Sequence, residues 1–167
     1  MAGLDILEFT DEIMRNAFTH HNPRSDILAR LVEQGCLGQK TGSGLYKYVK
    51  GDYTRHDNPE AQKIIANVRN EKKIAPRQVG RDEITERLVL RMVNEAYFVI
   101  AEGIAVRKSD IDVAMVLGTG FPDFRGGVLK YAGDLGIETV KERLDVLAEK
   151  FGERFKPCEY LKNMKGK

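Results

Sequence analysis

The sequence predicts an all-α protein, a bundle of about eight helices. Apolar residues recur at three- and four-residue spacing along most of the chain, as they do on one face of an amphipathic helix. The segment from Asp82 to Glu102 contains neither glycine nor proline. A short stretch from Leu45 to Val49 alternates as an extended strand does. Helices are therefore expected to form nearly all of the core.

The first half of the chain contains three expected helices. Residues 4–18, 25–35 and 58–69 each carry an apolar stripe at helical spacing. Ser25 is a favourable residue at a helix start, and the pair Asn58-Pro59 combines a capping side chain with a proline at the first helical position. Residues 70–80 are polar, basic and interrupted by a proline, so we expect a connector there.

The second half begins with a long helix. From Asp82 to Glu102, apolar residues cover well over half of the helix circumference, so this helix is expected to be central and largely buried. Three shorter helices are expected over residues 128–134 and 137–151 and from Pro157 onward.

The stretch from Asp110 to Gly127 joins the long helix to these shorter ones. Ser109 is expected to cap a helix that carries Asp110 and Asp112 in its first turn, the favourable end of the helix dipole for acids. Residues two apart on a helix do not face each other, so helix capping explains these aspartates better than paired-carboxylate catalysis.

The glycine-rich end of this stretch predicts a turn. Gly118 and Gly120 permit backbone angles that other residues resist, and Pro122 lies between aromatic residues that can pack the loop onto the bundle. Arg125 is a candidate either to bind an acidic group or to cap carbonyl groups of the preceding helix.

Composition restricts the class of protein. The 167 residues suit one domain or two small ones, and 42% of them are hydrophobic, which is enough for a core. The charge is nearly balanced at +2, which argues against a nucleic-acid binder. No apolar run approaches the roughly 18 residues of a membrane span. The acidic N-terminus is unlike a signal peptide, and Cys36 and Cys158 form no paired motif, so we expect reduced thiols and a cytoplasmic location.

The residues with catalytic potential do not make up a complete active site. His20, His21 and His56 lack the spacing of zinc ligands, and Asp57 beside His56 is a poor partner for acid–base catalysis. Lys40 comes before Gly42 and Gly44, whereas the lysine of a phosphate-binding P-loop comes after the glycines of that loop.

Glu95 lies mid-helix among apolar residues, where burial would raise the pKa of a carboxyl group. A buried catalytic glutamate and a structural pairing with a nearby arginine are both compatible with this position, and the pairing is favoured.

Two segments of the chain are similar. Residues 2–6 and 135–139 each open a helix, and each is followed by a shorter helix and a glycine, Gly35 and Gly166. The second copy is preceded by the long helix and the 110–127 stretch, whereas the first is preceded only by Met1. We therefore expect either a piece of a longer protein or a protein that takes its missing half from a partner.

Several short motifs follow one another along the chain: Gly38-Gln39-Lys40-Thr41-Gly42-Ser43-Gly44-Leu45-Tyr46-Lys47-Tyr48, Asn94-Glu95-Ala96, Glu102-Gly103-Ile104-Ala105, Asp110-Ile111-Asp112-Val113-Ala114-Met115, Gly118-Thr119-Gly120-Phe121-Pro122, Phe124-Arg125-Gly126-Gly127 and Glu153-Arg154-Phe155-Lys156-Pro157. In this order they resemble the C-terminal helical domains of NAD-dependent 3-hydroxyacyl-CoA dehydrogenases, as found in multifunctional enzymes of fatty-acid β-oxidation.

The resemblance implies three parts: the back half of a first helical unit over residues 1–50, a connecting helix and linker over 51–80, and a complete second unit over 81–167. Enzymes of this family carry an N-terminal Rossmann domain that holds NAD and the catalytic histidine, and nothing in this chain matches it. The family carries an asparagine followed by an arginine near the start of the long helix. In the second unit the matching pair is Glu86-Arg87, so glutamate replaces the asparagine. The resemblance therefore implies no catalytic residue, bound cofactor or metal in this chain.

In the whole enzyme, (3S)-3-hydroxyacyl-CoA is oxidised by NAD, and these helices would wall the acyl channel and bury domain and subunit interfaces. Lys40, Gly42 and Gly44 are the positions to test near the substrate. The structural motif residues are Glu95, Asp110, Asp112, Gly118, Gly120, Pro122 and Arg125. The implied partners are the acyl-CoA, a Rossmann domain in cis or in trans, and further copies in a homo-oligomer. The alternative is a non-catalytic helical module that docks on a separate Rossmann-domain subunit.

Overall fold

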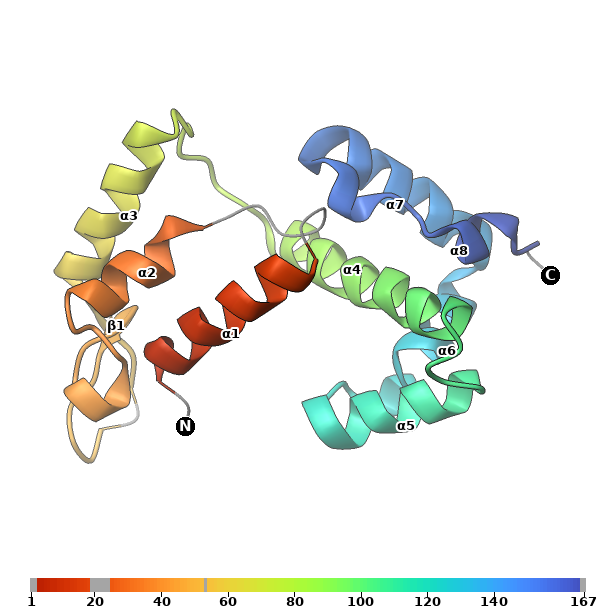
Figure 1. The fold of residues 1–167 in the computed structure, drawn as a ribbon, viewed down its shortest axis with the longest axis horizontal. Helices are drawn as coiled ribbons and strands as arrows, with labels where there is room; N and C mark the ends of the chain where they lie inside the picture. Colours follow the sequence, from red (N-terminus) through yellow and green to blue (C-terminus); the bar gives the residue numbers. More distant parts are fainter. Residues whose placement is uncertain (1–2, 19–24, 53, 166–167) are drawn as a thin grey trace. The chain divides into compact units, whose positions relative to one another are not determined.

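The computed structural model describes residues 3–18, 25–52 and 54–165. The chain divides into two compact units, Met1–Gln78 and Val79–Lys167 (Figure 1). The described residues form eight α-helices and one two-stranded sheet, which confirms the predicted all-α class.

The described residues of the first unit form three helices, one turn of 3-10 helix and the small sheet. Its elements are α1 (Leu4–Ala17), α2 (Asp26–Glu33), η1 (Gln39–Thr41), β1 (Tyr46–Lys47), β2 (His56–Asp57) and α3 (Pro59–Glu71). The two strands are antiparallel and pair Tyr46 with Asp57. Helix α2 contacts both α1 and α3. The core is small and consists of Leu31, Cys36, Ala61, Ile64 and Val68.

The start of α3 follows the expected pattern. Asn58 is fully buried, and its side-chain oxygen accepts a hydrogen bond from the backbone N–H of Glu60 at 3.2 Å. Pro59 takes the first helical position. Because proline has no N–H to lose there, this pair begins the helix at little cost.

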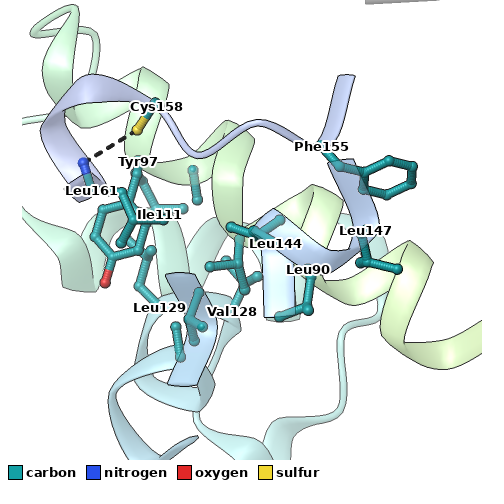
Figure 2. Close-up of a cluster of buried hydrophobic side chains, with 14 of the residues drawn as sticks. Leu90, Tyr97, Ile111, Val128, Leu129, Leu144, Leu147, Phe155, Cys158 and Leu161 are labelled. Atoms are coloured by element: carbon teal, nitrogen blue, oxygen red, sulfur yellow. Dashed lines mark hydrogen bonds between the residues drawn. The ribbon is translucent and has the colours of Figure 1, made fainter. Parts of the chain in front are cut away.

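From residue 79 to residue 165, the described part of the second unit forms five helices and two turns of 3-10 helix. Its elements are α4 (Arg81–Ala101), α5 (Lys108–Thr119), η2 (Asp123–Arg125), α6 (Val128–Leu135), α7 (Ile137–Phe151), η3 (Glu153–Phe155) and α8 (Glu159–Asn163). Helix α4 contacts α6, α7 and α8. Figure 2 shows the resulting core, which includes Leu90, Tyr97, Val128, Leu144 and Leu161.

Helix α4 is less buried than its apolar surface predicted. Five of its 21 residues are buried, namely Leu90, Val93, Asn94, Ala96 and Tyr97. Ile84 and Leu88 are 46% and 63% exposed. The buried residues all lie between Leu90 and Tyr97, so the expectation of a largely buried helix is wrong for the first turns of α4.

Two predicted helix starts also differ from the structure. Helix α5 begins at Lys108 after Arg107, without a capping side chain, so Ser109 is not its cap. Helix α8 begins at Glu159, not at Pro157, and the Cys158 sulfur accepts a hydrogen bond from the backbone N–H of Leu161. Cys158 occupies a buried position, and burial raises the pKa of its thiol.

Cys36 and Cys158 are both buried and form no disulfide. Among the helices that the structure describes, none is long and apolar enough to cross a membrane.

Candidate functional site

The glycine loop of the first unit contains Lys40, the lysine that was expected to lie near a substrate. Lys40 lies in η1, and its ammonium group donates to the Asp5 carboxylate at 2.5 Å. Asp5 lies in the first turn of α1. The hydrogen bond from Lys40 is the main cause of the lowered pKa of Asp5. Lys40 is thus paired with a carboxylate at the start of a helix, and its charge is already compensated.

The backbone of this loop is folded tightly. Gly42 has a φ of 71°, in the left-handed region that favours glycine. A Cβ atom at Gly44 would lie 2.8 Å from the Cα of Gly38, so a larger residue would push the two chain segments apart. The Asn58 amide donates to the carbonyl oxygen of Gly44 at 2.6 Å. The buried asparagine that caps α3 therefore also fixes the glycine loop, a contact across 14 residues that local sequence patterns did not indicate.

His56 forms an exposed pair with a carboxylate, but not with the neighbouring Asp57. Its Nε2 atom lies 2.7 Å from an oxygen of Asp52 and 2.9 Å from the hydroxyl of Thr54. Hydrogen bonds from Thr54, followed by that from His56, lower the pKa of Asp52 to about 2. Both side chains are exposed to solvent, so this pair lacks the enclosed substrate position that acid–base catalysis needs.

His20 and His21 lie outside the described residues. Among the residues that the structure does describe, no group of three histidine, cysteine or acidic side chains could hold a metal ion.

Asp112 belongs to α5, but its side chain caps α6. The carboxylate accepts hydrogen bonds from the backbone N–H groups of Leu129 at 2.6 Å and Lys130 at 3.1 Å, the first turn of α6. A Cβ atom at Gly127 would collide with the Asp112 side chain, so glycine is needed where the two helices meet. Asp112 thereby joins α5 to α6, whereas Asp110 forms an exposed ion pair with Arg107 at 2.9 Å.

Replacing Asp112 with alanine is expected to lower the free energy of unfolding by about 0.5–2 kcal/mol, because two helix N–H groups lose their acceptor. The matched control is Asp110→Ala, which removes an exposed ion pair and is expected to cost less than about 1 kcal/mol. Urea unfolding monitored by circular dichroism measures both. A cost for Asp110→Ala equal to or larger than that for Asp112→Ala would contradict the cap assignment.

The other residues of the 110–127 stretch have structural roles. Gly118 lies within α5, so the turn begins later than predicted, and Gly120 ends the helix with a φ of 72°. Pro122 immediately precedes η2. The Arg125 guanidinium lies over the rings of Phe124 and Tyr131, at 5.4 Å and 5.8 Å from their centres. Neither proposed role of Arg125 is seen among the described residues, and stacking on aromatic rings takes their place.

Glu95 pairs with Arg91 at 2.5 Å, four residues earlier on α4, and its side chain is 47% exposed. The preceding residue, Asn94, is fully buried and joins α4 to the segment before α8. Its amide donates to the carbonyl of Lys156 at 2.8 Å, and its side-chain oxygen accepts from the N–H of Cys158 at 2.9 Å. These residues hold helices together, and the described residues bring no nucleophile, base and oxyanion donor to one place.

The family described as "3-hydroxyacyl-CoA dehydrogenase, C-terminal domain" matches residues 1–48 and 84–166. Similar proteins include the peroxisomal bifunctional enzyme of Cavia porcellus, 36% identical over 98% of this chain. Another is the glyoxysomal fatty acid beta-oxidation multifunctional protein MFP-a of Cucumis sativus, 34% identical over 96%. The chain spans 24% and 23% of the lengths of these two relatives.

Solved structures share the fold. The dehydrogenase part of multifunctional enzyme 1 from C. elegans matches with a TM-score of 0.63 and 22% identity, covering 98% of this chain and 36% of that one. The 3-hydroxybutyryl-CoA dehydrogenase of Escherichia coli matches with a TM-score of 0.69 and 20% identity, covering 96% and 48%.

The predicted cytoplasmic location is contradicted by the relatives from Cavia porcellus and Cucumis sativus. Their names place them in peroxisomes and glyoxysomes. The sequence features behind that prediction, an acidic N-terminus and unpaired cysteines, argue against secretion and do not distinguish one intracellular compartment from another. The match to both segments of the chain settles the family: the chain belongs to the family of the 3-hydroxyacyl-CoA dehydrogenase C-terminal domain.

Proposed function

We propose that the chain acts as the C-terminal portion of a 3-hydroxyacyl-CoA dehydrogenase. In this enzyme, NAD would oxidise the 3-hydroxyl carbon of a (3S)-3-hydroxyacyl-CoA. A Rossmann domain, in cis or in trans, would hold NAD and the catalytic residues. The helices described above would line the acyl-CoA channel around Lys40, Gly42 and Gly44 and bury domain and subunit interfaces, including those of a homo-oligomer.

The observation that carries this proposal is an apolar face of α1 that the first unit does not cover. No residue described in α1 is buried. The repeat aligns Gly3-Leu4-Asp5 with Gly136-Ile137-Glu138 and so places Leu7 and Met14 at the positions of Val140 and Leu147. Val140 and Leu147 are 0% and 4% exposed, whereas Leu7 and Met14 are 50% and 43% exposed.

The difference between the two copies has a simple structural cause. Helix α7 of the second unit is covered by α4 and α6, and the first unit contains no counterparts of these helices among its described residues. A contiguous exposed apolar surface marks an interaction site. The face of α1 therefore fits a contact with a long preceding helix. That helix would be connected to the Rossmann domain.

This chain alone is expected to bind no NAD and to oxidise no acyl-CoA. Calorimetric titration with NAD tests the first expectation, and NADH absorbance in the presence of 3-hydroxybutyryl-CoA tests the second. Saturable NAD binding by the chain alone would overturn the assignment of cofactor binding to another domain.

The positive test adds a separately expressed Rossmann domain of the family that includes its first long helix. Dehydrogenase activity is expected to rise on mixing, and Leu7→Asp in α1 is expected to prevent the rise. Leu117→Asp is the matched control, because Leu117 is 82% exposed on α5. If the two polypeptides associate and activity does not change, the chain is a docking module without a part in the reaction.

A further inference from the structure

The second unit contains a cavity that the proposed function does not use. Its volume is about 580 Å³, within the roughly 300–1,000 Å³ of small-molecule sites. The apolar part of its lining comes from Tyr97, Leu129, Ile137 and Met164, which belong to α4, α6, α7 and the segment after α8. All of these elements lie in the same compact unit.

One end of the cavity is the N-terminus of α7. This helix is 15 residues long and begins after Gly136, which has no side chain to cap it. The first backbone bond within the helix runs from Val140 N–H to Gly136 C=O, so the N–H groups of the three preceding residues have no helical acceptor. Such a helix end favours a negatively charged group.

Lysine side chains add positive charge to the same cavity. Lys108 and Lys165 line it, and neither forms an ion pair with a described residue. The Lys108 ammonium lies 5.3 Å from the centre of the Tyr97 ring. The other charged groups around the cavity already have partners: Lys130 pairs with Asp134, Glu138 with Lys141, and Asp112 with the N–H groups of α6. The uncompensated charge is therefore positive.

Tyr97 supplies an independent indication of a ligand. Its side chain is 1% exposed, and its hydroxyl forms no hydrogen bond with any described residue although it belongs to the cavity lining. In Figure 2 this hydroxyl points away from Cys158. The hydroxyl oxygen is not among the fully buried atoms without a partner, so it is accessible and a ligand in the cavity can accept its hydrogen bond. Burial raises the pKa of Tyr97 to about 12, so at neutral pH the hydroxyl is a donor.

We propose that this cavity binds an organic anion with an aliphatic tail, a carboxylate or a phosphate monoester. The anionic group would lie at the N-terminus of α7 beside Lys108 and accept a hydrogen bond from the Tyr97 hydroxyl. The tail would lie against Leu129, Ile137 and Met164. A carboxylate and a phosphate present the same charge and hydrogen-bond acceptors, so the experiment compares both.

The test is calorimetric titration of the full chain with octanoate, octyl phosphate, octanol and inorganic phosphate. Octanoate or octyl phosphate is expected to saturate one site per chain, and the tighter of the two identifies the anionic group. Octanol and inorganic phosphate, which lack the charge and the tail respectively, are expected to bind at least about tenfold more weakly. If either of them binds as tightly as the complete amphiphile, the proposal is overturned.

Three variants connect binding to this cavity. Lys108→Gln is expected to weaken binding about tenfold and Tyr97→Phe about fivefold, the losses expected for a charge-assisted and a neutral hydrogen bond. Gly133→Met fills the cavity, because a side chain at Gly133 meets no atom within 4 Å, and methionine is the better helix former. This variant is expected to fold and to lose binding.

Lys150→Gln is the matched control, since Lys150 is an exposed residue in the last turn of α7. It removes the same charge and is expected to leave the affinity unchanged. Absence of saturable binding to the wild-type chain would overturn the proposal, as would unchanged affinity in the Gly133→Met variant.

Discussion

Replacing Asn94 with alanine is expected to lower the free energy of unfolding by about 2–4 kcal/mol. The Asn94 side chain is fully buried and makes two hydrogen bonds to backbone groups more than 60 residues away in the sequence. Alanine would leave the Lys156 carbonyl and the Cys158 N–H without their partner. Loss of the partner costs about 1–3 kcal/mol for the buried Cys158 N–H and less for the partly buried Lys156 carbonyl, so the effect is large for one substitution.

Urea unfolding of the full chain, followed by circular dichroism, measures this change. Asn163→Ala is the control, because Asn163 is an exposed asparagine in α8 of the same unit, and its loss is expected to change stability by no more than about 0.5 kcal/mol. Equal stability of the two variants would show that the Asn94 bonds do not join α4 to the end of the chain.

Raising the pH from 10 to 12 is expected to destabilise the wild-type protein more than the Tyr97→Phe variant. Burial is the main cause that raises the pKa of Tyr97 from 10.0 to about 12 in the folded protein. The phenol is neutral in both states below pH 10, so its contribution to stability is complete there. Above pH 10 the unfolded chain releases the proton first, and the contribution declines as the pH rises through the folded pKa.

The difference of two pKa units corresponds to about 2.7 kcal/mol, which is the limit of the expected loss. Equilibrium urea unfolding at several pH values between 9 and 12 gives the two stability curves. Phenylalanine has no group to ionise, so titrating residues that do not interact with Tyr97 affect both proteins equally and cancel in the difference. Parallel curves would contradict the assignment of the raised pKa to Tyr97.

The helical class of this protein was predictable because it depends on local patterns. The three- and four-residue apolar spacing places a helix at each segment where one forms, and Asn58-Pro59 begins α3 as expected. The order of short motifs was sufficient to identify the family. Helix ends were less predictable: a serine next to Asp110 suggested a cap, yet Arg107 occupies that position and α5 starts at Lys108.

The contacts of the polar residues were not predictable from neighbouring sequence. Asp112 looked like a cap for its own helix. Its carboxylate instead accepts hydrogen bonds from backbone N–H groups of α6, 17 and 18 residues further along the chain. His56 pairs with Asp52 and not with the adjacent aspartate. In each case the partner depends on how the backbone turns between the two residues, and periodicity contains no information about that turn.

The sequence by itself determined that the chain is helical and that no complete set of catalytic residues stands out, and it predicted that the segments beginning at residues 2 and 135 are related. Tertiary structure alone decided which apolar surfaces are covered, and therefore why Val140 is buried while Leu7, at the same position of the repeat, is exposed. It also decided that Tyr97, Lys108 and the start of α7 line one cavity. The physical reason is that helix formation depends on residues a few positions apart, whereas burial and side-chain pairing depend on which helices pack together.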